Sequence, residues 1–386
     1  MKLFMKMGVL LLVCLILANA SGLAADKGNF SIKPTKNNEK KWRIGYYEGG
    51  EYIEYQQTLL ATVKEMLELG WIETAEIPPQ QGIQTKELWN WLATQAKSQD
   101  LEFVADAHYS INWNNDLRQK VPHEIIERLN NKKDLDLMIA MGTWAGQDLG
   151  NDRHHTPTIV LAVSDAIAAK IVKSVEDSGY DHIHARVDPT RYERQIRIFH
   201  DIVGFKKLGV AYKDTVASRS YAAIETIAKV AKETGFEVVS CYITDSNELA
   251  VEEESVKKCF NELGQQKVDA IYVTQQKSIN AKTIPELVKT VNAYRIPTFA
   301  QSGSQEVQYG FLLSISQAGF KYVGRFYAET IAKILNGARP RQLEQLFEDP
   351  PKIAINLKTA EMIGYDPPVD VLGAADEIYQ EIGSPQ

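Results

Sequence analysis

Aromatic and hydrogen-bonding side chains follow directly after many of the short apolar stretches of this chain. If those stretches are strands of parallel sheets, the side chains lie beyond the carboxyl ends of the strands, where open α/β sheets bind ligands. The ligand-binding residues predicted in this way are Tyr46, Gly142, Thr143, Ser164, Asp165, Tyr212, Ser218, Thr274, Gln275, Gln301 and Ser302. Further residues at the same strand ends are Tyr47, Glu48, Trp144, Asp214 and Gln276.

The predicted set is rich in aromatic rings, hydroxyls and amides and poor in cations. Such groups suit a small polar or zwitterionic molecule that also carries a flat or apolar portion. Thr143 and Ser218 stand at predicted helix starts, where free backbone amides attract a carboxylate. Any single member of the set could equally be a turn or cap residue, so the prediction rests on the whole set.

The common nucleotide-binding and hydrolase motifs are missing from the sequence. No GxGxxG follows a predicted strand, and neither GxxxxGK[ST] nor GxSxG occurs. Gln301-Ser302-Gly303-Ser304 is a strand-end loop without a matched base, so a nucleophilic serine is not expected there. The sequence therefore favours binding over catalysis.

Two histidine pairs raise the question of a metal site. His154 and His155 precede a predicted strand, at the end of a sheet away from the usual ligand position. His182 and His184 would share one side of a strand. Because no Asp, Glu or His set at ligand spacing joins them, we expect surface histidines, no metal and no other cofactor.

Short apolar strands alternate with amphipathic helices from Arg43 onward, which predicts an α/β fold with parallel sheets covered by helices on both faces. Predicted strands cover residues 43–47, 101–105, 136–140, 158–163, 208–212, 237–243, 268–273 and 297–300. Predicted helices cover residues 52–69, 86–98, 116–131, 218–234, 248–263, 283–294 and 319–340, with a short helix after Gly142. Ser218 would cap the 218–234 helix. Residues 70–100 interrupt the series as an insertion.

Length and composition are those of a large globular protein. The chain has 386 residues, of which 44% are hydrophobic and 24% charged, which excludes disordered, collagen-like and disulfide-scaffold proteins. Two strand–helix series, each shorter than about 150 residues, predict two lobes. The formal net charge of −7 argues against general nucleic-acid binding, which needs basic patches.

The first 20 residues have the layout of a secretory signal. Lys2 and Lys6 precede an apolar run over residues 8–17, and Ala18-Asn19-Ala20 supplies a cleavage site. Residues 21–40 are predicted to form a flexible lead-in. The alternatives are an N-terminal membrane anchor and a lipoprotein modified at Cys14, although Val13 is a poor residue before a lipidated cysteine. We expect a mature protein that is soluble and exported.

Two cysteines, Cys241 and Cys259, remain after removal of such a signal. Export permits a disulfide. However, Cys241 lies in a strand-like run and Cys259 in a helical one, so we expect two separate buried thiols.

Several stretches carry a resemblance to a known family. They are IAMGT (139–143), TIVLAVSDAIAAKIVKS (158–174), KLGVAY (207–212), VDAIYVT (268–274), IPTFA (296–300) and PKIAINLKTAEMIG (351–364). Together with the 319–340 helix they resemble the substrate-binding proteins of ABC transporters, in the group that includes receptors for tryptophan and other aromatic amino acids. The resemblance runs from about residue 43 to the C-terminus, and the 351–364 stretch is its most specific part.

The resemblance implies a periplasmic-binding-protein type I fold, in which two Rossmann-like lobes joined by three crossovers close over a ligand. We expect residues 41–163 with 297–337 in lobe 1, and residues 164–296 with 338–386 in lobe 2. The chain departs from the family where members often carry an Asn/Asp pair, because it has Gln275-Gln276-Lys277 there. The loop after Ala300 also differs, so the family's ligand need not transfer.

The expected function is that of a monomeric solute-binding receptor in the periplasm. It would capture an amino acid or related small organic solute between its lobes and deliver it to an ABC permease in the inner membrane, without catalysis, cofactor or nucleic acid. The alternative is a ligand-sensing receptor for a signalling partner. An exported enzyme is disfavoured because no acid–base or metal set converges, and the leader excludes a cytoplasmic repressor of similar fold.

Overall fold

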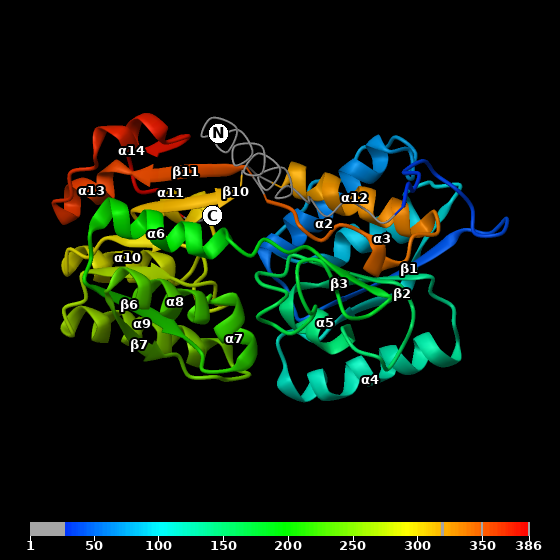
Figure 1. Ribbon diagram of the computed structural model, residues 1–386, viewed down its shortest axis with the longest axis horizontal. Coiled ribbons are helices and arrows are strands. Elements are labelled where there is room, and N and C mark those ends of the chain that lie inside the picture. Colours follow the sequence, from blue (N-terminus) through cyan, green and yellow to red (C-terminus); the bar gives the residue numbers. More distant parts are fainter. Residues whose placement is uncertain (1–27, 318–319, 349, 385–386) are drawn as a thin grey trace, which may run out of the picture.

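The computed structural model describes residues 28–317, 320–348 and 350–384, and the predicted signal lies outside them. Two sheets, both dominated by parallel strands, form two lobes that lie side by side (Figure 1), as the alternation of strands and helices predicts. The α/β fold class is therefore confirmed. Among the described residues, no helix is both long and apolar enough to cross a membrane.

The first lobe contains a five-stranded parallel sheet in the order β2-β1-β3-β4-β5. Its strands are β1 (Trp42–Glu48), β2 (Leu101–Ser110), β3 (Leu137–Met141), β4 (Thr158–Leu161) and β5 (Ile183–Ala185). Its helices are α2 (Ile53–Glu68), α3 (Lys86–Thr94), α4 (Asn115–Asn131), α5 (Gly142–Leu149) and α12 (Lys321–Leu335). One core packs α2, α3 and α12 on one face of the sheet, and a second core packs α4 and α5 on the other.

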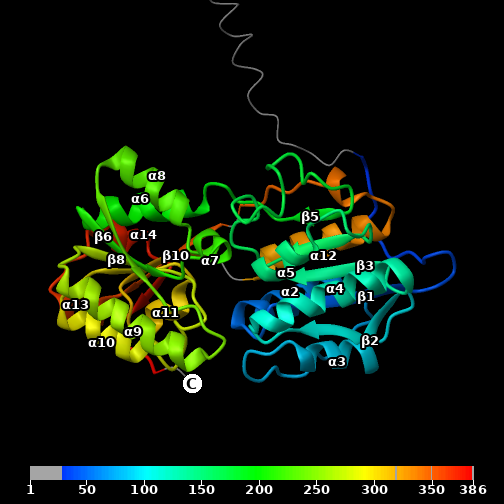
Figure 2. The same ribbon diagram turned by 90° about the horizontal axis from the view of Figure 1, so that it is seen from below.

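The second lobe contains a seven-stranded sheet in the order β12-β11-β10-β9-β8-β6-β7, in which only the β10–β11 pair is antiparallel. Its strands are β6 (Lys207–Tyr212), β7 (Glu237–Tyr242), β8 (Ala270–Val273), β9 (Thr298–Ala300), β10 (Leu313–Gln317), β11 (Pro351–Asn356) and β12 (Glu377–Tyr379). Its helices are α6 (Arg191–Val203), α7 (Val216–Tyr221), α8 (Ile224–Thr234), α9 (Leu249–Gln265), α10 (Ile284–Ala293), α11 (Ser304–Gln308), α13 (Leu357–Ile363) and α14 (Val369–Ala374). Helices again cover both faces (Figure 2).

The chain crosses between the lobes three times. It leaves β5 for α6, returns from β10 to α12, and crosses again from the short 3-10 helix Pro340–Gln342 to β11. The first and third crossovers pair with each other, since Val187 donates its N–H to the carbonyl of Gln345 at 2.7 Å. These paired segments are the crossover strands that the fold class predicts.

The sheets divide the chain at other places than the predicted lobe boundaries. Strands β9 and β10, within the 297–337 segment assigned to lobe 1, belong to the second sheet because β9 pairs with β8. Conversely, β5 lies within 164–296 yet pairs with β4 in the first sheet. Of the 297–337 segment, α12 packs with the first lobe. The sequence missed β5 because three residues carry no periodic signal.

The predicted 218–234 helix is two helices. Ala223, with a φ of +56°, lies between α7 and α8 in the left-handed region and interrupts the helix. The cap of α7 is Thr215, whose hydroxyl accepts the N–H of Ser218 at 3.2 Å, so Ser218 is an interior residue rather than a cap. Apolar spacing continues across the break, which is why periodicity did not reveal it.

Two further expectations are wrong. Cys241 in β7 and Cys259 in α9 form a disulfide, because α9 packs against β7 and brings their Cα atoms to 5.5 Å, a normal bridging distance. Within the lead-in, residues 28–40 are not a free linker. Phe30 and Ile32 pack against the first core, and the Ile32 carbonyl accepts the indole N–H of Trp71 at 2.9 Å.

Candidate functional site

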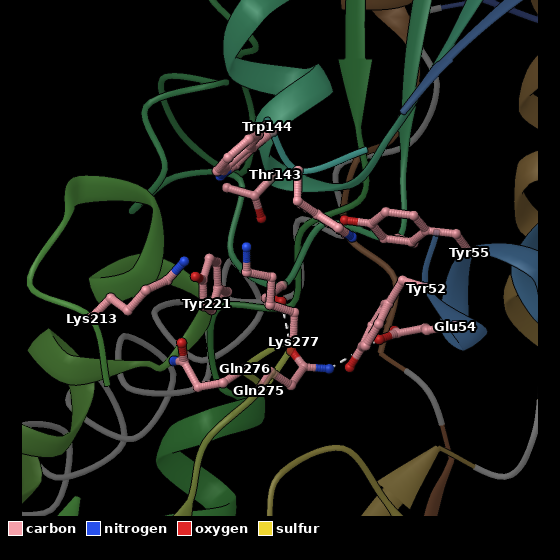
Figure 3. A pocket seen from close by; sticks show the side chains of 13 residues that line it. Tyr52, Glu54, Tyr55, Thr143, Trp144, Lys213, Tyr221, Gln275, Gln276 and Lys277 are labelled. Atoms are coloured by element: carbon pink, nitrogen blue, oxygen red, sulfur yellow. Dashed lines mark hydrogen bonds between the residues drawn. The ribbon is translucent and has the colours of Figure 1, made fainter. Parts of the chain in front are cut away.

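A cavity that is partly open to solvent lies between the two lobes (Figure 3). We call it the interlobe cavity. The first lobe lines it with Tyr52, Glu54, Tyr55, Trp113, Thr143, Trp144, Ala162 and Ser164. The second lobe lines it with Lys213, Tyr221, Gln275, Gln276 and Lys277. Most of these residues follow the carboxyl ends of β1, β3, β4, β6 and β8, so the strand direction brings both lobes' polar ends to one place.

Aromatic rings form a continuous wall on the first-lobe side. Tyr52 and Tyr55 pack edge to face with centroids 5.3 Å apart, and Tyr55 lies 6.0 Å from Trp113. Trp113 in turn meets Trp144 edge to face at 5.5 Å. The guanidinium of Arg118 lies 4.3 Å from the centroid of the Trp144 ring and fixes it by a cation–π contact. Such a wall suits the flat or apolar part of a ligand.

Two glycines let these rings approach the backbone. Gly142 has a φ of +83°, and a Cβ atom built there would lie 1.9 Å from the hydroxyl of Tyr55. Gly50, with a φ of +156°, lies against Trp113, and an added Cβ there would fall 2.8 Å from the backbone nitrogen of Trp113. Larger residues at either position would push the ring away from the cavity wall.

Gln275 connects the two lobes through its side-chain amide. The hydroxyl of Ser164 donates to its Oε1 at 2.8 Å, and its Nε2 donates to the carboxylate of Glu54 at 2.9 Å. Its backbone N–H donates to Oε1 of Gln301, whose own Nε2 donates to the carbonyl of Tyr221 at 2.7 Å. Gln301 therefore acts behind the cavity by fixing Gln275 and the end of α7.

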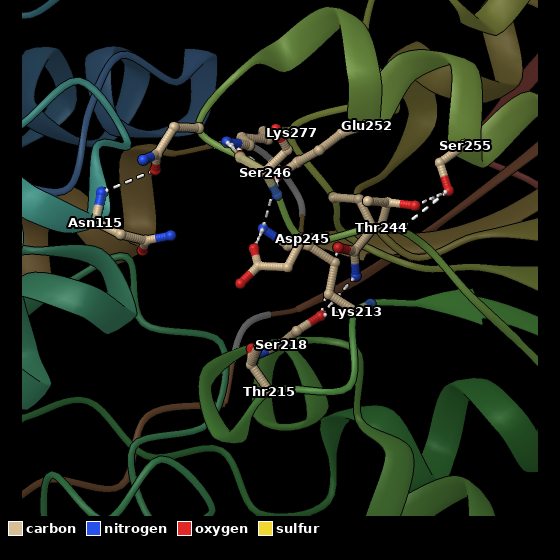
Figure 4. Close-up of polar contacts among 12 residues, drawn as sticks. Asn115, Lys213, Thr215, Ser218, Thr244, Asp245, Ser246, Glu252, Ser255 and Lys277 are labelled. Carbon is tan, nitrogen blue, oxygen red and sulfur yellow. Dashed lines mark hydrogen bonds and ion pairs between the residues drawn. The ribbon is translucent and has the colours of Figure 1, made fainter.

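Two lysines occupy the second-lobe wall (Figure 4). Lys213 and Lys277 each place Nζ 3.2 Å from the same oxygen of Glu252, and Lys213 also pairs with Asp245 at 3.2 Å. Burial by itself lowers the pKa of Lys213, but the nearby Tyr221 and the two carboxylates raise it by more, so the net pKa is raised. Lys213 is therefore charged at neutral pH.

Of the predicted ligand-binding residues, Thr143, Ser164 and Gln275 line the interlobe cavity, as do the neighbouring Trp144 and Gln276. Gly142 lies beneath Tyr55, and Gln301 lies behind Gln275. Ser302 hydrogen-bonds the side chains of Tyr52 and Glu306, and it therefore lies next to the part of the cavity wall that Tyr52 forms.

The other predicted residues do not line the cavity, and each has an internal partner. Tyr46 is buried and donates its hydroxyl to Glu48 at 2.7 Å. The Asp165 carboxylate accepts the N–H groups of two residues that follow it, and Thr274 donates to the Ala211 carbonyl at 2.6 Å. Tyr212 packs in the second core, and the Ser218 hydroxyl accepts the N–H of Lys213.

Three remaining strand-end neighbours also lie elsewhere. Tyr47 donates its hydroxyl to Asp148 at 2.8 Å, Glu48 is buried beside Tyr46, and Asp214 pairs with Arg219 at the surface.

Reading the strand ends from the sequence does not reach most of the aromatic wall, for two different reasons. β1 ends at Glu48, and the next eight residues contain Tyr52, Glu54 and Tyr55 at the start of α2, just beyond the residues considered. β2 runs to Ser110, five residues past its predicted end, so Trp113 was not recognised as a strand-end residue. Lys213 directly follows β6 and could have been found by the same rule.

Of the two histidine pairs, only His155 is exposed as expected. His154, His182 and His184 are buried, and their Nε2 atoms hydrogen-bond the carbonyls of Leu149, Asn151 and Glu344. Burial lowers the pKa of His154 to about 4. Among the described residues, no group of three or more His, Cys, Asp or Glu side chains is arranged to hold a metal ion.

The family model described as "ABC transporter substrate binding protein" matches residues 101–379 of this chain. A curated relative, the tyrosine-binding protein of Clostridioides difficile (strain R20291), is 26% identical over 229 residues, which are 59% of this chain and 63% of the relative. The match thus spans less than two thirds of that relative's length.

Solved structures share the fold at low identity. One is an ABC domain in complex with L-Trp from Streptococcus pneumoniae, with a TM-score of 0.66 and 19% identity. A conserved domain protein from Vibrio cholerae has a TM-score of 0.64 and 19% identity. A ligand-free, open substrate-binding protein from Clostridium difficile has a TM-score of 0.57 and 20% identity. Each comparison covers 88% of this chain and 100% of the other.

The periplasmic-binding-protein type I fold is shared with these structures, and the family match covers well over half of the chain. The protein therefore belongs to the ABC transporter substrate-binding protein family.

Proposed function

We propose that this protein is an exported receptor that captures an aromatic amino acid or a related small solute in the interlobe cavity and delivers it to an ABC permease. The observation that carries this proposal is the composition of the cavity. Four aromatic side chains from the first lobe face hydrogen-bonding and ionic groups from the second, so a ligand with a flat part and a polar end contacts both lobes.

The relatives support the ligand class. A curated relative is named as a tyrosine-binding protein, and a solved structure of the same fold is described in complex with L-Trp. Both ligands combine a flat ring with a carboxylate and an ammonium group. The interlobe cavity offers Glu54 and two lysines as charges of opposite sign, together with the aromatic wall.

Contacts across the cleft support capture by lobe closure. Besides the Gln275 bridge, Ser220 in α7 donates its hydroxyl to the carbonyl of Asp165 at 3.2 Å. The N–H of Asn115 at the start of α4 donates to the side chain of Asn247 at 3.0 Å. Together with the paired crossovers these contacts suit a hinge that closes around a ligand and thereby alters the surface that a permease meets.

A thermal-shift and calorimetry screen of the twenty amino acids tests this proposal. The protein is first unfolded and refolded to remove ligand carried through purification. A ligand at a hundred times its Kd stabilises the folded state by about 2.7 kcal/mol, so an aromatic amino acid raises Tm by several degrees. If no amino acid raises Tm and none produces binding heat, the proposed ligand class is wrong.

Delivery to a permease and export are tested in cells. Deleting the gene abolishes high-affinity uptake of the radiolabelled ligand if the protein serves a permease, whereas a sensor leaves uptake unchanged and alters a signalling response. N-terminal sequencing of the exported protein gives a start near Ser21 if the predicted signal is cleaved. Finding Met1 on that protein contradicts cleavage, and fatty acid at Cys14 assigns a lipoprotein instead.

A further inference from the structure

Two lysines line one part of the interlobe cavity, and their side chains are largely buried. The side chain of Lys213 is 5% exposed and that of Lys277 is 14% exposed. In Figure 3 the ammonium group of Lys277 points toward Thr143 at the start of α5, and that of Lys213 lies next to Tyr221. An ammonium group desolvated in this way is costly unless acceptors and negative charge surround it.

Each of these ammonium groups has more N–H donors than acceptors around it. Lys213 Nζ meets Glu252 and Asp245 at 3.2 Å each. Lys277 Nζ meets the same oxygen of Glu252 at 3.2 Å and the carbonyl of Ser246 at 3.3 Å. Since an ammonium group has three N–H donors, one on each lysine has no acceptor among the described residues.

The two carboxylates beside these lysines differ in burial. Glu252, whose side chain is 1% exposed, is a single carboxylate shared between two ammonium groups. Asp245 is 44% exposed, so solvent screens its charge. The two ammonium groups therefore face one buried carboxylate and one that is partly in solvent, and a ligand anion would add negative charge on the buried side of the lysines.

The first lobe presents compatible groups to the same region. Thr143 is buried and lies in the first turn of α5, an eight-residue helix whose first amides have no partner within the helix. The positive end of the helix dipole and the Thr143 hydroxyl both favour an anion. An anion between α5 and the lysines is thus held from both lobes at once.

We propose that Lys213, Lys277 and Thr143 form a carboxylate subsite and that the carboxylate, rather than the ammonium group, is the ionic group that the interlobe cavity selects. The ligand class is then aromatic carboxylates, with or without an amino group. This inference rests on the proposed receptor function and deepens it. Glu54, the lining carboxylate, is already engaged by Gln275, so it contributes less to selection.

Calorimetry with three matched probes tests the inference on the full mature protein. The probes are L-tryptophan, indole-3-propionate, which lacks the ammonium group, and tryptamine, which lacks the carboxylate. The two carboxylates are expected to bind within about tenfold of each other, and tryptamine about a hundredfold or more weaker than L-tryptophan. The corresponding tyrosine series repeats the measurement. Equal or tighter binding of the amine overturns the inference.

Variants of the two lysines test whether these side chains cause the preference for carboxylates. Lys277→Met is expected to weaken both carboxylates about ten- to a hundredfold while leaving tryptamine unchanged. The matched control is Lys282→Met, because Lys282 pairs with Glu253 at the surface, is 74% exposed and does not line the cavity. Because Lys213 and Lys277 share one oxygen of Glu252, removing either lysine leaves that buried carboxylate with one partner fewer. Lys213 is therefore tested in the double variant Lys213→Met/Glu252→Gln, and Glu252→Gln alone shows what the loss of the carboxylate does in either lysine variant. Unchanged carboxylate affinity in both variants contradicts the subsite.

Native mass spectrometry of the freshly purified protein separates this inference from the receptor proposal. A copurified ligand without any anionic group overturns the carboxylate subsite but leaves the receptor function intact. If neither probe series binds, a panel of aromatic monocarboxylates including benzoate is titrated. Binding there supports the subsite while the amino-acid proposal fails, and the absence of binding to every carboxylate overturns both.

Discussion

At the scale of single residues, the proposed role of Thr143 in ligand contact rests on its place in the fold. It follows β3 directly, begins α5 and is buried in the wall of the interlobe cavity. Its hydroxyl is the kind of small donor whose loss changes binding without disturbing the core.

Thr143→Ala is therefore expected to weaken ligand binding about ten- to a hundredfold, as the loss of one hydrogen bond costs about 1–3 kcal/mol in a closed cleft. The Tm of the ligand-free protein should change little. Calorimetry and a thermal melt measure the two effects, and Thr94→Ala is the control, since Thr94 is exposed on α3. An unchanged Kd in Thr143→Ala would remove Thr143 from the site.

Glu48 gives the first lobe a pH-dependent stability. Burial raises the pKa of Glu48 to about 7, although hydrogen bonds from Tyr46 and Thr85 work in the opposite direction. The folded protein thus keeps a proton that the unfolded chain releases above pH 4.5, so this group's contribution to stability is present in acid and is lost as the pH rises toward 7.

The difference between the Glu48 pKa of about 7 in the folded protein and 4.5 in the unfolded chain corresponds to about 3 kcal/mol of unfolding free energy. This contribution is lost by pH 8. Urea unfolding at pH 5 and pH 8 measures it. Glu48→Gln should flatten the pH dependence by making the protein relatively more stable at pH 8. An identical slope of stability against pH in both proteins would show that Glu48 is ionised throughout.

At the scale of secondary-structure elements, the junction of β3 and α5 shows how backbone geometry positions the aromatic wall. Gly142 turns the chain with a positive φ and leaves room for the Tyr55 ring of α2. The junction thus fixes two cavity walls at once, the start of α5 and the side of α2.

Gly142→Ala should lower stability by about 1–3 kcal/mol and weaken ligand binding, because the added methyl group collides with Tyr55. Gly364→Ala is a matched control. Gly364 also has a positive φ, +72°, but has nothing within 4 Å of an added Cβ. Equal destabilisation in both variants would mean that only the backbone conformation matters and that Tyr55 moves freely.

Apolar periodicity predicted most of the longer elements. It failed where the outcome depends on tertiary packing. The strands β1, β3, β6 and β8 and the helices α2, α9 and α10 are apolar over enough residues to be recognised, whereas α6, β10 and β11 were not predicted. Strand β5 has three residues, and β12 lies at the sheet edge. Whether Cys241 meets Cys259 depends on how α9 packs on β7, which residue spacing does not encode.

The same limit applies to the candidate site. Thr143, Ser164 and Gln275 could be located because strand direction alone brings them to the cleft. Tyr212 and Thr274 fulfil the same rule but point into the sheet interior, where each finds an internal partner. Which side a strand-end residue faces depends on the packing of the helix that follows it.

At the scale of the whole molecule, the two lobes communicate through Gln275. Its amide contacts Ser164 and Glu54 of the first lobe while its backbone is held by Gln301 of the second. If the cleft closes on a ligand as proposed, these bonds form together with the contacts to that ligand.

Gln275→Ala should reduce ligand affinity by about tenfold or more and leave the ligand-saturated protein more open. Small-angle scattering with and without ligand measures the change in the radius of gyration. Gln266→Ala, an exposed glutamine at the end of α9, is the control. If the variant compacts as much as the natural protein on ligand addition, the bridge does not govern closure.

Helix α12 returns from the second lobe to pack against α2, with Gly324 so close that an added Cβ would lie 2.8 Å from the backbone of Ala61. During synthesis the first lobe therefore remains incomplete until residue 335 has been made, after most of the second sheet. A fragment ending near residue 190 would expose the apolar face of α2 and is expected to lack cooperative unfolding. If the protein is exported as proposed, this late completion of the first lobe suits a chain that crosses a membrane before it folds.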